Sequence, residues 1–153
     1  MDSPALWNRF HNERILPIYG DHLEFKDNFE PADLLLIVGT LQYILDDIPS
    51  FLNNVLISSS PQAVIFSRSP MLDEANDQFV SQIVSLLDET DKESKWVIPI
   101  RVHSLQLLIA EMQKLDFELW RHSKKWPYKL ANCNDLKDTF YIDLYFKRNI
   151  FRE

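Results

Sequence analysis

An unbroken apolar run from Leu34 to Val38 precedes Gly39 and stands out in the hydrophobic pattern of this chain. Such a continuous run is typical of a strand that is covered on both faces, as in a parallel sheet. A glycine at the end of a buried strand allows a sharp turn or the close approach of a ligand. Because ligands of open α/β sheets bind outside the carboxyl ends of the strands, we expect any site in this chain to follow Val38.

The residues after Gly39 predict a helix and then a second buried strand. An acidic pair at residues 46–47 comes before Pro49, which is typical of the first turn of a helix. Ala63 to Phe66 is a short apolar run, in part β-branched, and predicts the strand. The predicted helix lies between Pro49 and this strand, and its apolar residues at helical spacing are Phe51, Leu52, Val55 and Leu56.

The middle of the chain predicts two further helices with an extended segment between them. Residues 71–95 are polar around one apolar stripe, which indicates an amphipathic helix, with a solvated loop from Asp88 to Lys95. Trp96 to Ile100 is apolar and extended. Ser104 is the expected N-cap of the next helix, whose stripe faces the core. The two stripes are Phe79, Ile83, Val84 and Leu87, and then Leu105, Leu108, Ile109, Met112 and Leu115.

The C-terminal part predicts two strands with no helix between them. Phe117 to Arg121 is the first, and residues 140–147 alternate with a strict period of two. Two successive strands of this kind indicate an antiparallel pair. The apolar positions of the alternation are Phe140, Ile142, Leu144 and Phe146.

Together these elements predict one α/β domain over residues 1–153, with a mostly parallel sheet and an antiparallel pair of strands at its C-terminal end. A length of 153 residues suits one domain, and 46% hydrophobic with 25% charged residues is ordinary for a globular protein. Residues 1–14 are expected to form a polar arm or a short helix. Ile15 to Tyr19 is an edge-strand candidate because Pro17 cannot donate to a ladder.

Charge and targeting signals narrow the function. The chain has 16 Lys and Arg residues against 23 Asp and Glu residues, a net charge of -7, which argues against non-specific binding to nucleic acid or anionic membranes. A local basic patch at residues 121–129 stays open. The chain start lacks the basic and apolar regions of a signal peptide, and no apolar run approaches the ~18 residues of a membrane span. We therefore expect a cytoplasmic protein with no membrane span and no nucleic-acid partner.

Glycine, cysteine and histidine positions argue against several chemistries. The two glycines, Gly20 and Gly39, cannot supply the clustered glycines of a P-loop, a dinucleotide fingerprint or a nucleophile elbow. Cys133 has no flanking histidine or basic motif, so we interpret it as an ordinary thiol near a loop. No pair of histidines has the i, i+4 spacing of a helical zinc site, so we expect no metal. The histidines are His11, His22, His103 and His122.

Two stretches, Ile18 to Asp21 and Ala32 to Asp46, resemble the middle of class I S-adenosylmethionine-dependent methyltransferases. In those enzymes an acidic residue follows the third strand, and the fourth strand begins with Asp and ends in a loop containing Leu and an aromatic residue or His. Val97 to Ser104 and Leu115 to Leu119 resemble the closing helix and the "Gly-Phe" strand, with Asp116 in the place usual for Gly. The sequence is most similar to bacterial methyltransferase-like proteins that are often associated with surface-polysaccharide synthesis.

The resemblance covers roughly residues 13–148 and corresponds to the second half of such an enzyme. It implies a Rossmann-like three-layer sheet that lacks the first strand, the glycine-rich loop for the methionine part of the cofactor, and the acidic end of strand two. It also implies residue roles. Asp21 would lie near the adenine amine, the backbone of Gly39, Thr40 and Leu41 would line the cofactor cleft, Gln42, Tyr43 and Arg68 would face the methyl acceptor, and His103 would be the catalytic base.

Each of these roles has a plainer alternative that the sequence leaves open. Asp21 could stabilise a turn. Tyr43 could pack in the core, and Arg68 could form a surface salt bridge. His103 could be a partly exposed residue that simply precedes the N-cap of a helix.

Two functions follow from the resemblance. The first is a truncated or split S-adenosylmethionine-dependent methyltransferase-like protein that acts on a small molecule or sugar intermediate. The second is a non-catalytic α/β subunit that pairs with a partner chain. Without its first strand, the fold would leave residues 34–38 as an unpaired edge, which a partner, the N-terminal segment or a second copy would cover. We therefore expect weak or no binding of S-adenosylmethionine by the isolated chain.

Overall fold

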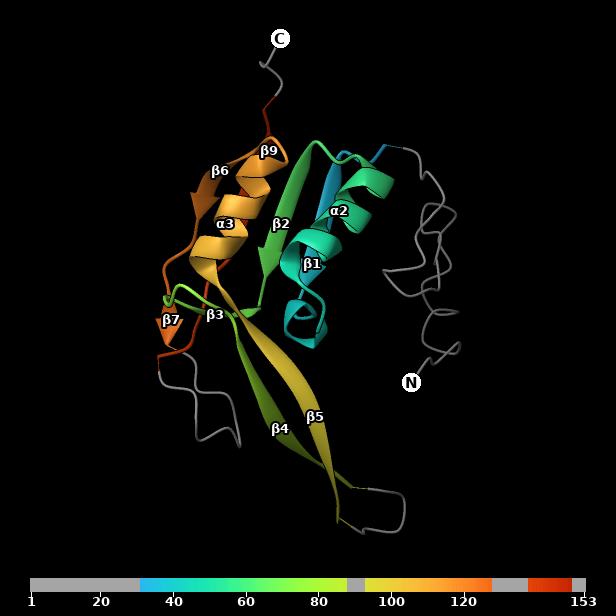
Figure 1. Ribbon diagram of the computed structural model, residues 1–153, viewed down its shortest axis with the longest axis vertical. Helices are drawn as coiled ribbons and strands as arrows, with labels where there is room; N and C mark the ends of the chain where they lie inside the picture. Colours follow the sequence, from blue (N-terminus) through green and yellow to red (C-terminus); the bar gives the residue numbers. More distant parts are fainter. Residues whose placement is uncertain (1–30, 88–92, 128–137, 150–153) are drawn as a thin grey trace.

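The computed structural model describes residues 31–87, 93–127 and 138–149 (Figure 1). Within these ranges the chain forms two sheets, two α-helices and a short 3-10 helix. The candidate edge strand at 15–19, the arm at 1–14, Asp21 and Cys133 lie outside the described residues. Neither of the described helices has the length and apolar character needed to cross a membrane. A cytoplasmic location stays a prediction.

The first sheet has the strand order β1-β2-β9-β6. Strand β1 (Leu34–Val38) runs parallel to β2 (Ala63–Ser67), and β2 pairs antiparallel with β9 (Leu144–Arg148). Strand β6 (Phe117–His122) pairs antiparallel with β9. The antiparallel C-terminal pair is therefore confirmed.

Both helices begin where their capping residues predict. Helix α2 (Ile48–Ser59) has Asp47 as its N-cap, and the Asp47 carboxylate accepts a hydrogen bond of 2.8 Å from the backbone N–H of Ser50. Helix α3 (Leu105–Lys114) has Ser104 as its N-cap, and the Ser104 hydroxyl accepts from the N–H of Leu107 at 3.3 Å. These bonds satisfy donors that the first helical turn otherwise leaves unpaired.

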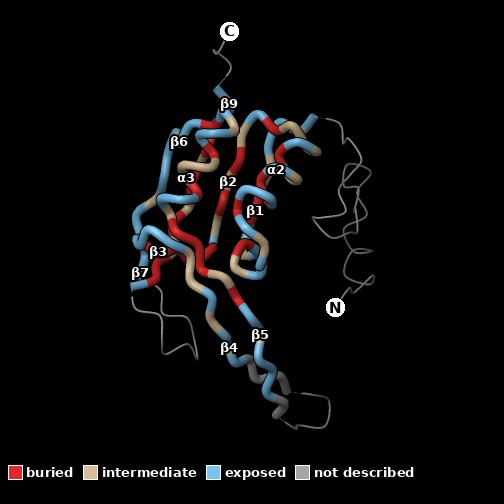
Figure 2. Tube along the Cα trace, in the orientation of Figure 1, coloured by how far each residue is buried: buried red, intermediate tan, exposed pale blue. Residues whose placement is uncertain are grey.

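The core lies between the first sheet and the two helices, which cover the same face of it (Figures 1 and 2). The rings of Phe66 on β2 and Phe146 on β9 meet edge to face, with centroids 5.9 Å apart. All four apolar positions of the alternation at residues 140–146 are buried, as its period of two predicts. The single strand that it predicts is interrupted at residues 142–143, because β8 (Phe140–Tyr141) belongs to the second sheet and β9 to the first. The helices contribute Leu52, Leu56, Leu108 and Met112 to this core.

Strand β1 is less buried than its sequence predicts. Leu34, Leu36 and Val38 are 49%, 57% and 43% exposed, whereas Ile37 is buried. The strand is apolar on both faces, but the described helices cover only one face, and no described strand pairs with its outer edge. The prediction of a strand buried on both faces is therefore wrong for the described residues, and the three-layer arrangement stays a prediction.

The second sheet has the order β4-β5-β3-β8-β7 and includes a long hairpin that projects from the body (Figure 1). Strand β4 (Gln78–Leu87) pairs antiparallel with β5 (Glu93–Ser104) along its whole length. The segment Trp96 to Ile100 is extended, as predicted. The shorter strands are β3 (Pro70–Leu72), β7 (Trp126–Pro127) and β8 (Phe140–Tyr141). The prediction of a mostly parallel sheet is wrong for the described strands, because only β1 with β2 and β3 with β5 pair in parallel and the other pairings are antiparallel.

The helix predicted within residues 71–95 is wrong, because β4 occupies residues 78–87. Phe79, Ile83 and Leu87 are spaced by four residues, and an even spacing places side chains on one face of a strand as well as on one face of a helix. These three positions therefore do not distinguish the two structures, and only Val84, the fourth residue of the predicted stripe, has a spacing that suits a helix alone. Pairing with β5, the following strand of the same hairpin, determines the strand.

Candidate functional site

Gly39 turns the chain at the carboxyl end of β1, as predicted. Its φ of 60° lies in the left-handed region, which side chains with a Cβ disfavour. A Cβ at this position would meet only the carbonyl oxygen of Arg68, at 3.9 Å, so backbone strain and not crowding favours glycine. The Gly39 N–H donates to the carbonyl of Ser67 at 2.9 Å. The turn after β1 is therefore fixed against the end of β2.

The residues after Gly39 form the 3-10 helix η2 (Leu41–Tyr43). Leu41 is fully buried, and Thr40 is exposed. The Gln42 side-chain amide donates from Nε2 to the carbonyl of Gly39 at 3.0 Å, while its buried Oε1 has no hydrogen-bond partner among the described residues. Tyr43 is 51% exposed and is not part of the core. The structure thus brings these four predicted residues together at one strand end.

Arg68 comes directly after β2 and lies beside the turn at Gly39. It is exposed, with a φ of 54°, and the described residues offer it no ion pair. Next to it, the hydroxyl of Ser69 is buried without a hydrogen-bond partner among the described residues. The carboxyl ends of β1 and β2 therefore combine the open backbone at Gly39 with the guanidinium of Arg68. They also hold two buried polar atoms without a partner among the described residues, Oε1 of Gln42 and Oγ of Ser69.

His103 lies at the end of β5, at the junction with α3, and is fully buried. Its Nε2 is 3.1 Å from the carbonyl oxygen of Leu41, and its Nδ1 is 3.1 Å from Oδ2 of Asp77. The alternative of a partly exposed residue before an N-cap is wrong. The structure does bring His103 to the predicted site. There the His103 side chain contacts the backbone carbonyl of Leu41.

Asp77 joins three groups in this region and was not among the residues that the sequence indicated. Its carboxylate accepts from Nε of Arg101 at 2.8 Å and from the backbone N–H of Ser104 at 2.7 Å. Arg101 in turn donates from Nη1 to the carbonyls of Leu45 at 3.2 Å and Asp46 at 2.6 Å. The network therefore ties the loop after η2 to the base of the β4–β5 hairpin.

The charge state of this network follows from its contacts. Burial raises the pKa of the Asp77 carboxyl, but the hydrogen bonds from His103 and Ser104 and the positive charges of His103 and Arg101 together lower that pKa below its ordinary value of 3.8. The Asp77 carboxylate and the Leu41 carbonyl can only accept hydrogen bonds. Both contacts of His103 are therefore hydrogen bonds only when each of its ring nitrogens carries a proton.

This geometry suits His103 to positioning. A general base needs a ring nitrogen within reach of the proton that it removes, and both nitrogens of His103 are engaged with protein atoms. The catalytic role of His103 stays a prediction. What the arrangement does directly is to hold Leu41, and with it the turn from Gly39 to Tyr43, against β5.

Known proteins offer a comparison at the level of fold. No protein-family model and no curated protein matches this sequence. A solved S-adenosylmethionine-dependent methyltransferase from Clostridium acetobutylicum matches with a TM-score of 0.56 and 13% identity, over 93% of this chain and 69% of that one. The chain has a methyltransferase-like fold. This confirms the class I resemblance for the fold, whereas the likeness to polysaccharide-associated proteins stays a prediction.

The glycopeptide N-methyltransferase MtfA is a second structural neighbour of this chain. Its complex with S-adenosylmethionine matches with a TM-score of 0.50 and 9% identity, over 84% of this chain and 58% of that one. Its complex with sinefungin matches with a TM-score of 0.51 and 10% identity, over 84% of this chain and 57% of MtfA. The chain therefore spans less than two thirds of MtfA, so cofactor binding and activity are not transferred with the fold.

The described residues fit the cofactor in part. The turn at Gly39 offers open backbone, and Oε1 of Gln42 and Oγ of Ser69 are buried polar atoms without a protein partner among the described residues. The chain has only two glycines, so it holds no glycine-rich loop for the rest of the cofactor. No group of three or more potential metal ligands is found in the ranges that the structure describes.

Proposed function

We propose that this chain is a truncated or split methyltransferase-like domain in which the turn from Gly39 to Leu41 lines part of an S-adenosylmethionine site. The observation that carries the proposal is the left-handed Gly39 at the carboxyl end of a parallel strand pair, within a methyltransferase-like fold. Ligands of open α/β sheets bind at this end of the strands. Asp21 would contact the adenine amine.

The proposed acceptor, a small molecule or sugar intermediate, would lie beside Gln42, Tyr43 and Arg68. S-adenosylmethionine supplies the methyl group when bound, and the protein contributes chiefly by positioning the two reactants. His103 would support this positioning by fixing the Leu41 carbonyl. If the acceptor is a hydroxyl group, a base that takes its proton is also needed, and His103 could serve only after releasing Leu41 or Asp77.

A titration of the whole chain with S-adenosylhomocysteine, followed by amide NMR, tests the cofactor site. We expect weak binding, with shifts at residues 39–43 and 67–69 and around Asp21. If no amide in these segments moves at about 10 mM ligand, the proposed site is rejected. Calorimetry tests the two parts of the proposal separately. One-to-one binding in the micromolar range would support the methyltransferase function but would contradict the proposal that the domain is truncated or split.

The exposed edge of β1 favours a second candidate, a non-catalytic subunit that pairs with another chain. Leu34, Leu36 and Val38 are exposed, and β1 ends the described strand order. Long apolar strand edges are usually covered in folded proteins. A partner polypeptide that adds a strand beside β1 would cover this edge.

Hydrogen exchange and sedimentation distinguish a partner polypeptide from two alternatives, an edge covered by the chain itself and an edge covered by a second copy. A monomer whose β1 outer-edge amides exchange fast, and slow down only with a partner, is the expected result. Slow exchange in the monomer would mean that the chain covers its own edge. A concentration-dependent dimer with slow exchange would identify a second copy as the partner.

A further inference from the structure

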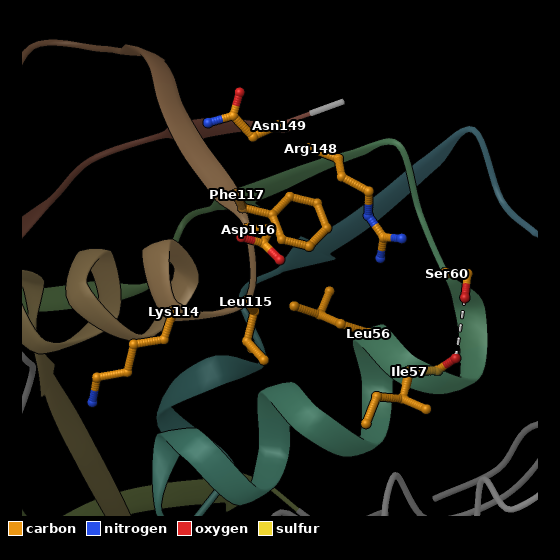
Figure 3. A pocket seen from close by; sticks show the side chains of 9 residues that line it. All are labelled: Leu56, Ile57, Ser60, Lys114, Leu115, Asp116, Phe117, Arg148 and Asn149. Atoms are coloured by element: carbon orange, nitrogen blue, oxygen red, sulfur yellow. Dashed lines mark hydrogen bonds between the residues drawn. The ribbon is translucent and has the colours of Figure 1, made fainter. Parts of the chain in front are cut away.

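A cavity of about 430 Å³ lies at the end of the first sheet opposite to Gly39 (Figure 3). It is formed by the last turn of α2, the turn between α3 and β6, and the end of β9. In the sheet register, Phe117 pairs with Arg148 and Ala63 pairs with Lys147, so this is the amino end of the parallel strands. Its volume is within the range of small-molecule sites.

Arg148, the last residue of β9, contributes its guanidinium to this cavity. Figure 3 shows the side chain directed toward the space between Phe117 and Ser60. Its Nε is buried and has no hydrogen-bond partner among the described residues, and its Cζ lies 5.1 Å from the centroid of the Phe117 ring. The described residues give the guanidinium no ion pair. A buried N–H without an acceptor is costly, and a carboxylate that binds side-on to Nε and Nη would satisfy it.

The other side of the cavity holds the carboxylate of Asp116 and the ammonium group of Lys114, which pairs with Glu111. Helices α2 and α3 both end there, and the carboxyl end of a helix carries a partial negative charge. The Asp116 side chain also lines the cavity. Asp116 has another interaction in the protein, but two carboxylate oxygens can accept several hydrogen bonds. An ammonium group of a ligand is therefore favoured on this side, in the same cavity as the site for a carboxylate.

Apolar side chains complete the cavity. Leu56, Leu115 and Phe117 line it between the two charged sides (Figure 3). Phe117 and Leu56 belong to the buried core, so they form a fixed apolar wall. A ligand that matches all three features carries one positive group, one negative group and an apolar body.

We propose that this cavity binds a small zwitterion with an apolar side chain, such as an α-amino acid of the size of leucine. Its carboxylate would bind Arg148, its ammonium would face Asp116 and the helix ends, and its side chain would lie on Leu56, Leu115 and Phe117. The site is separate from the turn at Gly39, and it does not depend on the proposed methyltransferase function.

Three probes of matched shape test the proposal by NMR titration of the whole chain. Leucine carries both charges, 4-methylpentanoate lacks the ammonium, and 3-methylbutylamine lacks the carboxylate. We expect leucine to shift the Nε–Hε resonance of Arg148 and the amides of residues 115–117 in a saturable way. Each truncated probe is expected to bind at least about tenfold more weakly, because it loses one charge-assisted contact.

The variant Arg148→Lys keeps the charge but removes the side-on pair of donors. It is expected to weaken leucine binding about tenfold, whereas Arg121→Lys, on exposed β6, leaves it unchanged. The proposal is overturned if no probe gives a saturable shift, if both truncated probes match leucine, or if Arg148→Lys binds as well as the unaltered chain. If Arg148→Lys does not fold, the probe series on the unaltered chain still decides.

Discussion

The Nε2 atom of His103 lies 3.1 Å from the carbonyl oxygen of Leu41, a residue 62 positions earlier in the chain. This contact joins the base of the β4–β5 hairpin to the turn after β1. The other ring nitrogen meets Asp77, which also holds Arg101 and the N-cap of α3. The polar network of Asp77, Arg101 and His103 therefore fixes the position of the turn after β1 relative to the second sheet.

Replacing His103 tests the positioning role. In His103→Leu, the buried Asp77 carboxylate loses one partner and the Leu41 carbonyl loses its donor, so we expect a loss of about 3 kcal/mol in the free energy of unfolding. Urea denaturation measures this loss. The matched control is His122→Leu, because His122 is exposed and its replacement is expected to change stability by less than about 0.5 kcal/mol. Equal stability of the two variants would contradict the role.

The Asp77 network also predicts how stability depends on pH. The folded-state pKa of Asp77 is lower than its ordinary value of 3.8, so the folded protein holds the Asp77 proton less tightly than the unfolded chain does. The stabilisation is therefore fully present above that ordinary value and is lost as the pH falls through the lowered pKa. Urea midpoints measured across the acidic range should show a steeper decline for the unaltered chain than for Asp77→Asn.

Asp73→Asn is the control for this pH dependence, since Asp73 is exposed and pairs with Lys125 at the surface. We expect this variant to keep the acid-dependent decline of the unaltered chain. If Asp77→Asn shows the same decline as well, carboxylates outside the network are responsible for it.

Gly39 offers a test of backbone strain at the strand end. Because its φ is 60° and a Cβ would have room, Gly39→Ala is expected to cost roughly 1–2 kcal/mol through strain alone. Gly39→Asn should cost less, since asparagine tolerates the left-handed region better. Thermal or urea unfolding measures both variants. A cost for alanine no greater than that for asparagine would show that φ is not the constraint.

The sequence predicted the elements whose signals are local. Asp47 and Ser104 mark the starts of α2 and α3 because a capping side chain needs only its own first turn. The period of two in residues 140–146 predicted which side chains are buried, since alternation follows directly from strand geometry, but it did not show that the strand is interrupted between β8 and β9. The sharp turn at Gly39 could also be predicted, because few other residues adopt its backbone conformation.

Features that depend on contacts with other segments of the chain could not be predicted in the same way. Strand β4 was mistaken for a helix because a spacing of four residues suits both structures, and only β5 decides between them. Asp77 was missed because its partners Arg101 and Ser104 lie 24 and 27 residues away. No local motif in the sequence signals that a single aspartate will accept from an arginine, a histidine and a helix cap.

The two faces of β1 provide the last test, because adjacent residues point to opposite sides of a strand. Leu36 is 57% exposed and Ile37 is 7% exposed. We expect Leu36→Lys to change the free energy of unfolding by less than about 0.5 kcal/mol, and Ile37→Ala to lose about 2–4 kcal/mol. If a partner polypeptide covers β1, Leu36→Lys should abolish its binding while the chain stays folded, as measured by sedimentation with the partner. A Leu36→Lys variant as unstable as Ile37→Ala would instead show that the exposed face of β1 is already buried within this chain.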